Sequence, residues 1–370
     1  MLIGVDASRA TGGQRTGTEN YSLHLIRALL RGDLSNSYVL YCNQPPALGT
    51  FSETPNGAVR SLPSRHLWTH LRLASEIARR PPDVLFVPAH VVPVVCRCPA
   101  VVTIHDLGYL AYPEAHSLAA RLYLNLSTRH SVRVARRVIA VSQATKGDLT
   151  AKLGVPAGKI AVVPEACPPG YTPLADRRQG QAVAAKYGLG EPYLLAVGTL
   201  HTRKNLVRLL EAFALARRQQ GLPHRLGLVG RPGWQAFAIE EAITRLGIGD
   251  AVVLTGYVPE EDLPLLIGAA DALAFPSLYE GFGLPALEAM ACRVPVVAAN
   301  TTSLPEVVGD AGLLVDPCDV EDLACGLARV LTDRALHDEL AERGRLRSGL
   351  FSWERAASKT LAVLLAAASA

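Results

Sequence analysis

The sequence predicts an α/β protein made of two Rossmann-like domains with parallel sheets that face one another across a cleft. Short apolar runs rich in β-branched residues alternate with segments of helical periodicity along almost the whole chain. Such alternation is typical of parallel strands joined by crossover helices. The pattern restarts after a segment rich in proline and glycine that runs from residue 164 to 190. The length of 370 residues fits about two to three domains.

The apolar runs define the strands that we expect, and the spacing of the remaining apolar residues defines the helices. We expect a first domain over residues 1–170, a linker over 171–190 and a second domain over 191–350. A last helix over 353–370 is expected to pack back on the first domain. The expected strands are 2–5, 84–87, 100–104 and 138–141 in the first domain, and 193–197, 225–229, 252–255, 272–276 and 294–298 in the second.

Composition excludes several classes of protein. Lysine and arginine number 37 against 33 aspartate and glutamate, and this net charge of +4 is too weak for a dedicated nucleic-acid binder. The seven cysteines are an odd number without CxxC spacing, which argues against a disulfide scaffold or a structural metal and favours a reducing compartment. The N-terminus lacks the pattern of a signal peptide. The longest apolar stretch, 84–96, is too short to cross a bilayer. We therefore expect a soluble, cytoplasmic protein.

Ligands of open α/β sheets bind beyond the carboxyl ends of the strands, so the loops that leave the strands are the candidate sites. The loop after strand 193–197 runs from Gly198 to Asn205 and carries Arg203 and Lys204 before a helix. Cations are disfavoured at a helix N-terminus unless an anion binds there, and a diphosphate is the candidate anion. A solvated pair on a surface turn is the alternative.

The loop after strand 272–276 contains two carboxylates, Glu280 and Glu288, with Gly281 and Gly283 between them. The glycines let the backbone approach a ligand closely. Two carboxylates at different depths offer acceptors for the hydroxyl groups of a polyol. The same residues match a G-x-G-x-x-A dinucleotide pattern, but no acidic residue follows the next strand as that pattern requires.

Two loops of the first domain are further candidates. His105 and Asp106 follow strand 100–104, where a histidine can donate hydrogen bonds or transfer protons; a structural histidine with a capping aspartate is the alternative. The loop from Thr11 to Asn20 contains Gly17, which can lie close to a phosphate or to an acceptor. Together the loops indicate a nucleotide-sugar donor in the second domain and an acceptor in the first.

At these positions the sequence resembles the retaining glycosyltransferases of family 4, which have the GT-B fold. The most specific match is the E-x7-E pair Glu280 and Glu288, and the block from Gly198 to Asn205 also matches. The segment Thr103–Leu107 is similar to the branch that contains bacterial polysaccharide mannosyltransferases. One departure stands in the first loop, where Glu19 and Asn20 replace a glycine and an arginine of the family pattern.

The resemblance implies a role for each matched residue. Arg203 and Lys204 would bind the donor diphosphate and stabilise the leaving group, and His105 would face the donor sugar. Glu288 would bind the ribose. Glu280 and the amides of Gly281, Phe282, Gly283 and Leu284 would hold the sugar and phosphates. Tyr257 and Val258 would contact the base, and Gly198 the phosphates. Gly17 would lie close to the phosphates or to the acceptor.

The resemblance implies transfer of mannose or another hexose, with retention, from a nucleoside-diphosphate sugar to a hydroxyl group of a saccharide or lipid-linked saccharide. GDP-mannose is the first candidate donor and a UDP-sugar the second. No cofactor is expected, and because no D-x-D occurs we expect a metal-independent reaction. A nucleotide-sugar epimerase on the same fold, an NAD-dependent oxidoreductase and a non-enzymatic binding protein are the alternatives.

A run of basic residues leaves membrane contact open. It comprises Arg121, Arg129, His130, Arg133, Arg136 and Arg137, within one predicted helical stretch. Such a patch can bind anionic lipid at the inner face of a membrane and present a lipid-linked acceptor. The alternative is a solvated helix face.

Overall fold

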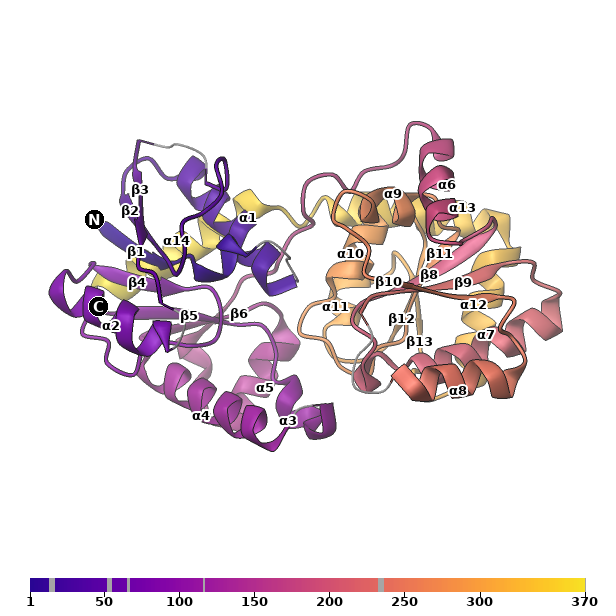
Figure 1. Cartoon of the computed structure of the whole chain (residues 1–370), viewed down its shortest axis with the longest axis horizontal. Helices are drawn as coiled ribbons and strands as arrows, with labels where there is room; N and C mark the ends of the chain where they lie inside the picture. The colour runs from indigo at the N-terminus through magenta and orange to yellow at the C-terminus, as the bar shows by residue number, and fades with distance from the viewer. Residues whose placement is uncertain (13–16, 52–54, 65–66, 116, 232–235, 370) are drawn as a thin grey trace. The chain divides into compact units, whose positions relative to one another are not determined.

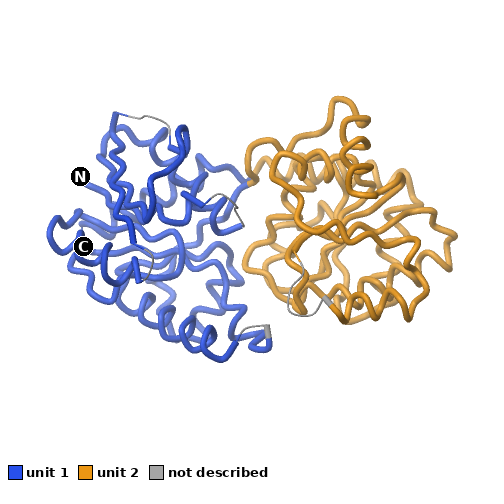
Figure 2. Tube along the Cα trace, viewed as in Figure 1, with its two compact units in different colours: residues 1–166, 351–370 blue, residues 167–350 orange. Residues whose placement is uncertain are grey.

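The computed structural model describes the chain apart from residues 13–16, 52–54, 65–66, 116, 232–235 and 370. It divides into two compact units (Figure 2). Residues 1–166 and 351–370 form the first unit, and residues 167–350 form the second. The C-terminal segment is therefore part of the first unit.

The first unit has a seven-stranded parallel sheet in the order β3-β2-β1-β4-β5-β6-β7 (Figure 1). Apart from β7 this is the Rossmann order, in which the chain changes direction between β1 and β4. Every residue of β4 and β5 is buried, as expected for strands covered by helices on both faces. The strands are Leu2–Asp6, Ser37–Cys42, Gly57–Ser61, Val84–Val87, Ala100–Ile104, Arg137–Ala140 and Ile160–Val162.

Helices and short helical turns connect these strands. Serine side chains cap the first turns of two helices. The Ser117 hydroxyl oxygen accepts a hydrogen bond from the Ala120 N–H at the start of α4, and that of Ser142 accepts one from the Thr145 N–H at the start of α5. The helical segments of the first unit are η1 Ser8–Thr11, α1 Gly17–Gly32, η2 Thr69–Leu73, α2 Ala74–Arg79, α3 Gly108–Ala111, η3 Pro113–Ala115, α4 Leu118–Val134, α5 Gln143–Leu153, η4 Ala157–Lys159 and α14 Trp353–Ser369.

Helix α14 packs against α1 within the first unit. Its buried side chains recur every three or four residues, which is the spacing of one helix face. The Trp353 ring stacks on His24 at 5.5 Å between ring centroids and meets the Tyr21 ring edge-on at 6.0 Å. These contacts tie the end of the chain to its beginning.

The second unit repeats the architecture with a six-stranded parallel sheet in the order β10-β9-β8-β11-β12-β13. The change of direction lies between β8 and β11, which pair directly. The strands are Tyr193–Val197, Arg225–Val229, Val252–Gly256, Ala272–Phe275, Val296–Ala299 and Leu313–Val315 for β8 to β13. The helical segments are α6 Arg177–Lys186, η5 Thr202–Lys204, α7 Leu206–Gln220, α8 Ala236–Leu246, α9 Leu263–Gly268, α10 Leu284–Ala291, α11 Leu304–Val308, α12 Val320–Thr332 and α13 Arg334–Ser348.

The expected linker over 171–190 is not a linker over its whole length. Helix α6 lies within it and packs on α9. The two helices approach so closely that a Cβ at Gly180 would lie 2.5 Å from the Ala269 Cβ and from the Leu265 carbonyl oxygen. The helix therefore belongs to the second unit, which begins at Cys167.

Candidate functional site

The loops that follow β8 and β11 meet at the point where the strand order of the second sheet reverses. The Asn205 side chain links the loops of this region to one another: its Nδ2 donates to the Pro276 carbonyl at 3.2 Å and to the Pro317 carbonyl at 2.6 Å. The Leu278 N–H donates to the Arg203 carbonyl at 2.8 Å. Ligands of open α/β sheets bind at such a reversal. The two loops that carry the predicted cations and carboxylate are thus fixed to one another.

Both predicted cations contact the first predicted carboxylate. Lys204 Nζ lies 2.6 Å from Glu280 Oε1, and Arg203 Nη1 lies 2.9 Å from Glu280 Oε2. Burial alone would raise the pKa of the Glu280 carboxyl, but the charges of Lys204 and Arg203 outweigh it and lower this pKa to about 2. Glu280 is therefore ionised at neutral pH. Lys204 and Glu280 are buried and Arg203 is half-buried, so the cluster holds two positive charges and one negative charge largely out of solvent.

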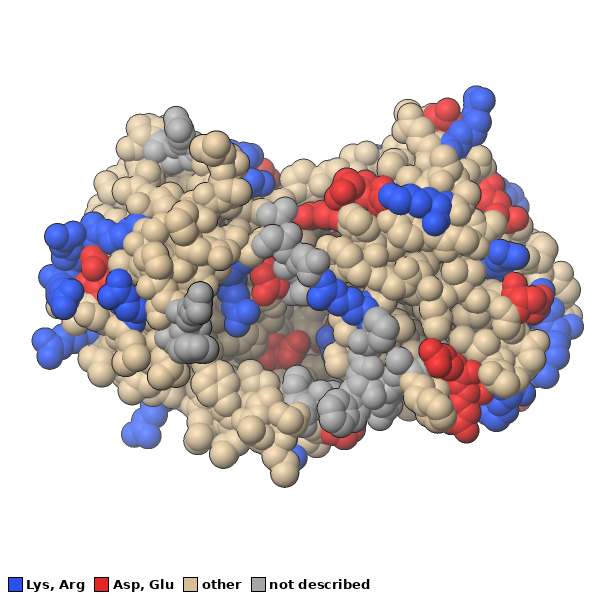
Figure 3. Space-filling view, viewed as in Figure 1, with Lys and Arg blue, Asp and Glu red and all other residues tan. Residues whose placement is uncertain are grey.

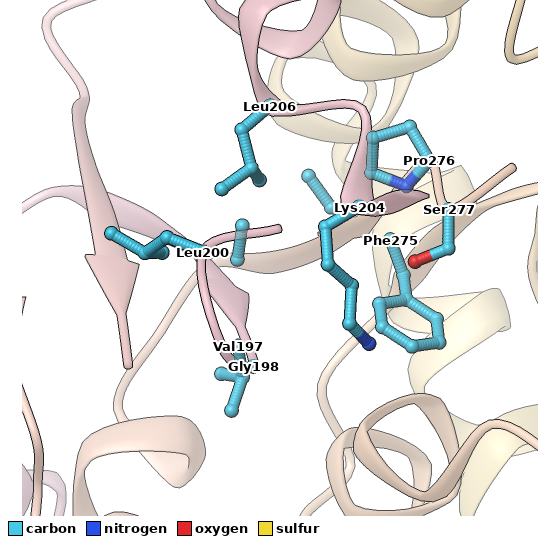
Figure 4. A pocket seen from close by; sticks show the side chains of 10 residues that line it. Val197, Gly198, Leu200, Lys204, Leu206, Phe275, Pro276 and Ser277 are labelled. Atoms are coloured by element: carbon cyan, nitrogen blue, oxygen red, sulfur yellow. The ribbon is translucent and has the colours of Figure 1, made fainter. Parts of the chain in front are cut away.

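The Lys204 side chain ends beside the ring of Phe275, with Nζ 4.6 Å from the ring centroid (Figure 4). A Cβ at Gly198 would lie 2.9 Å from Lys204 Cε, and Gly198 has φ +138°. The backbone conformation at this position therefore favours glycine, and any Cβ here would also displace the end of the Lys204 side chain. A cavity of about 10 Å³ opens beside these residues. Gly198 therefore lies next to the Lys204 ammonium group.

The loop that contains Glu280 is held from the other side by residues that sequence reasoning missed. Thr302 Oγ1 accepts from the Glu280 N–H at 3.1 Å. Ser303 Oγ lies 3.0 Å from the Glu280 carbonyl oxygen and 2.7 Å from that of Phe282, and its hydroxyl donates there. Both follow β12, so a polar loop after a predicted strand was the signal that pointed to them.

Most of the remaining residues of the E-x7-E segment are buried at or before the start of α10. Gly283 has φ +119°, and a Cβ there would lie 2.7 Å from Leu304. Gly281 and Phe282 are buried, whereas Leu284 is half-buried. Glu288 lies on the second turn of α10 and is buried. Burial and the charge of Glu288 raise the pKa of the Cys292 thiol to about 12.

The predicted base contacts lie at the end of β10. Val258 is buried, whereas Tyr257 is 42% exposed. The Arg231 guanidinium lies 4.9 Å from the centroid of the Tyr257 ring, in cation–π contact. Gly230 follows β9, and the absence of a side chain there lets the loop after β9 approach the loop after β8. A Cβ at Gly230 would lie 2.1 Å from the Gly198 carbonyl oxygen. The ends of β8, β9 and β10 therefore form one continuous edge.

The structure places His105 and Gly17 in the first unit. Gly17 begins α1, and residues 13–16 of the predicted loop before it lie outside the described residues. His105 is buried, with Nδ1 2.9 Å from Glu165 Oε1 and Nε2 2.9 Å from the Pro88 carbonyl oxygen. Burial would lower the pKa of His105, but the hydrogen bond and charge of Glu165 raise it. Both ring nitrogens are therefore engaged within the unit, and Glu165 is a partner that the sequence analysis did not assign.

Comparison with known proteins connects this geometry to a family. The model "Glycosyltransferase Family 4" matches residues 15–169, and the model "Glycosyl transferases group 1" matches residues 182–347. The O-antigen chain mannosyltransferase B of Escherichia coli is 37% identical over 263 residues, which cover 71% of this chain and 69% of that protein. The chain belongs to glycosyltransferase family 4. It is a glycosyltransferase, and the epimerase and oxidoreductase alternatives are not supported.

Other relatives match over shorter parts. The serotype-specific mannosyltransferase WbdA of E. coli is 35% identical over 180 residues, which cover 48% of this chain and 22% of that protein. Among solved structures, sucrose-phosphate synthase from Thermosynechococcus elongatus has a TM-score of 0.75 at 24% identity, covering 98% of this chain and 97% of that one. Anabaena HepE in complex with UDP and glucose has a TM-score of 0.76 at 22% identity, covering 99% of each chain. These structures share the GT-B fold, as predicted.

Proposed function

We propose that this glycosyltransferase moves mannose, or another hexose, from a nucleoside-diphosphate sugar to a hydroxyl group of a saccharide or lipid-linked saccharide. The ion cluster of Arg203, Lys204 and Glu280 carries this proposal. GDP-mannose is the preferred donor because the two E. coli relatives described above are named as mannosyltransferases, and a UDP-sugar is the second candidate. Synthesis of a cell-surface polysaccharide or glycolipid is the proposed context, since one of these relatives is named for the O-antigen chain.

The cluster is suited to departure of a diphosphate. Glu280 balances one of the two positive charges, and the second remains for an anion. When the bond between the anomeric carbon and the phosphate oxygen breaks, negative charge grows on the diphosphate. Arg203 and Lys204 stabilise that charge from fixed positions, which lowers the barrier without reorganisation of solvent. Two side-chain cations would thereby do the work of a metal ion, so the reaction needs none.

The other donor contacts extend from this cluster. Gly198 would offer its backbone to the phosphates, and the amides of Gly281 and Gly283 would have the same role. Tyr257 and Val258 would contact the base, and Glu288 the ribose. In the first unit, Gly17 would contribute a backbone contact. Because both nitrogens of His105 are engaged, its contribution would come from its ring or from the positive charge favoured by Glu165.

Retention at the anomeric carbon is part of the proposal. It would arise by attack of the acceptor hydroxyl on the face that the leaving diphosphate occupies, with the hydroxyl proton passing to the departing phosphate oxygen. The new bond joins the acceptor oxygen to the anomeric carbon, and the nucleoside diphosphate carries the proton away.

The test is a transfer assay with GDP-mannose or UDP-glucose as donor and octyl α-D-mannoside as acceptor, followed by mass spectrometry and by NMR of the product anomer. We expect an α-linked mannoside from GDP-mannose and loss of at least 90% of turnover in Lys204→Met. The control is Lys186→Met, because Lys186 is an exposed partner of Asp262 in the same unit. Equal loss in both variants, or a β-linked product, would contradict the proposal.

We also propose peripheral contact with an anionic membrane through α4. No helix of the described chain is long and apolar enough to cross a membrane. Leu118, Leu122 and Leu126 recur every four residues and are 59–81% exposed. Arg129 and Arg133 continue the same face and are exposed. The surface over α4 carries few charged side chains in Figure 3. An apolar stripe that leads into cations is the pattern of an interfacial helix.

The structure corrects the basic run that the sequence analysis placed in one helix. Helix α4 ends at Val134, so Arg136 and Arg137 lie beyond it. Arg137 donates to the Gly158 carbonyl, and His130 Nε2 lies 3.4 Å from the Pro93 carbonyl oxygen. Arg121 remains exposed at the side of the leucine stripe. The proposed surface is thus more apolar than the sequence suggested.

Co-sedimentation with vesicles tests this contact. Wild type is expected to bind phosphatidylglycerol vesicles more strongly than phosphatidylcholine vesicles, and Leu122→Ser with Leu126→Ser to reduce binding at least fivefold. Leu346→Ser is the control, since Leu346 is an equally exposed leucine of the second unit. Binding that survives both substitutions on α4 would refute the proposed surface.

A further inference from the structure

The loop that follows β4 lies where the strand order of the first sheet reverses. Strand β1 pairs with β4, and β4 pairs with β5. This is the position in the first unit that corresponds to the reversal between β8 and β11 in the second, and reversals of this kind are where α/β sheets bind ligands. The loop begins with Pro88, Ala89 and His90. His90 is not one of the residues of the predicted site.

His90 is held in a backbone conformation that non-glycine residues rarely adopt. Its φ is +49°. The Val91 N–H donates to the Ala89 carbonyl at 2.6 Å and closes a three-residue turn around His90, which with positive φ is the strained form of the γ-turn. The strain persists because neighbours fix the loop on each side. The His90 N–H donates to the Thr103 carbonyl at 3.1 Å, and the Pro88 carbonyl accepts from His105.

The surroundings of His90 keep its imidazole neutral. Its ring centroid lies 5.5 Å from that of His105. Burial and the nearby charge of His105 lower the pKa of His90 to about 4; Asp106 opposes this shift, and Arg9 adds to it. Among the residues that the structure describes, no side chain or carbonyl hydrogen-bonds either ring nitrogen, and the side chain is half-buried rather than enclosed. One nitrogen of a neutral imidazole is a hydrogen-bond acceptor and the other is a donor.

We propose that His90 binds a hydroxyl group of the acceptor sugar, with one ring nitrogen accepting from that hydroxyl. The inference rests on the proposed function, because it assumes that the first unit takes the acceptor. A backbone strain that several contacts maintain is typical of a residue whose side chain must be aimed. His105 cannot take this role through its nitrogens, because Glu165 and Pro88 already engage them.

The hydroxyl group that His90 binds belongs to the acceptor sugar and not to the donor. The groups suited to binding a sugar diphosphate belong to the second unit: Arg203, Lys204 and Glu280. The proposed hydrogen bond of His90 does not require any of them. A single neutral histidine, which can both donate to and accept from a hydroxyl, suits an uncharged sugar rather than a phosphate. The proposed ligand class is therefore a saccharide with a free hydroxyl group.

Two substitutions separate binding from backbone strain. His90→Gly removes the ring and relieves the strain, and His90→Asn keeps a hydrogen-bonding side chain in a residue that tolerates positive φ. With octyl α-D-mannoside and GDP-mannose, we expect His90→Gly to raise the acceptor KM at least tenfold and leave the donor KM within twofold. His90→Asn should lie between wild type and His90→Gly. The melting temperature of His90→Gly should be unchanged or higher than that of wild type, because the strain is relieved. A merely structural role of His90 would therefore predict no change in the acceptor KM, which separates it from a binding role.

Saturation-transfer NMR with methyl α-D-mannoside in the presence of GDP measures binding without turnover. Wild type is expected to show saturation of the sugar, and His90→Gly to lose it. An unchanged acceptor KM in His90→Gly, a rise in the donor KM instead, or absence of saturation in wild type would overturn the inference. A thermal shift with GDP or UDP, measured in all three proteins, reports the proposed function separately. If wild type shows no such shift, the donor site itself is contradicted. If it shows the shift, an unchanged acceptor KM in His90→Gly contradicts only the role of His90.

Discussion

Replacing Glu280 by glutamine is expected to destabilise the second unit, because Lys204 would then be a buried cation without a carboxylate. The pKa of Glu280 falls from 4.5 to about 2. At 1.36 kcal/mol per pKa unit this corresponds to about 3 kcal/mol of stabilisation. Removing one partner of a buried ion pair typically costs about 3–5 kcal/mol, which agrees. For a unit of this size the loss corresponds to roughly 6–12 °C in melting temperature.

The assay is thermal unfolding combined with hydrogen exchange of peptides from each unit, since a two-unit chain need not unfold in one step. The loss should be confined to peptides from the second unit. Glu339→Gln is the control: Glu339 pairs with Arg343 on the surface, where both side chains are about half exposed. Its substitution should change stability by less than about 0.5 kcal/mol.

The pH dependence gives the sign of the effect. A carboxyl whose pKa is lowered by folding adds stability above its unfolded pKa of about 4.5, and that stability is lost as the pH falls towards the folded value of about 2. The difference between wild type and Glu280→Gln should therefore be full at pH 7 and shrink below pH 4.5. A difference no larger than that of Glu339→Gln, or one independent of pH, would refute the assignment of a buried ion cluster.

Three further predictions concern His105, Gly198 and metal ions. Folding raises the pKa of His105, which adds stability that is full below about pH 6.5 and is lost as the pH rises through the folded pKa. Melting curves and hydrogen exchange of the first unit should show this loss in wild type and not in Glu165→Gln. Gly198→Ala should displace Lys204 and weaken binding of GDP about tenfold by calorimetry, whereas Gly221→Ala, which also has positive φ but open space, should not. Dialysis against EDTA should leave the transfer rate within twofold, and recovery of a lost rate by Mg²⁺ would contradict metal independence.

Much of the fold was predictable because strands of a parallel sheet that are buried on both faces consist of continuous runs of apolar residues. All nine expected strands are found with ends within two residues. Strand β3 was missed because it lies at the sheet edge and is largely exposed, so it has no apolar run. Strands β7 and β13 have three residues each and are too short to stand out. Strand β2 does have the pattern, with a buried run from Tyr38 to Cys42, and could have been predicted.

The site was predictable as a set of loops but not as a set of contacts. Arg203, Lys204 and Glu280 each follow a predicted strand, so the rule that ligands bind at carboxyl ends finds them. The pairing of Lys204 with Glu280 spans 76 positions, and that of His105 with Glu165 spans 60. Pairings at such separations are set by sheet order, which local patterns do not encode. The strain at His90 is likewise visible only in the backbone.

Titration calorimetry with GDP and UDP tests the central claim, that the Lys204 cluster holds the donor diphosphate, most directly. The comparison is between wild type, Lys204→Met and the surface control Lys186→Met. The account predicts that wild type and Lys186→Met bind one of the two nucleotides with similar affinity and that Lys204→Met binds at least tenfold more weakly. Equal affinity in all three proteins would contradict it.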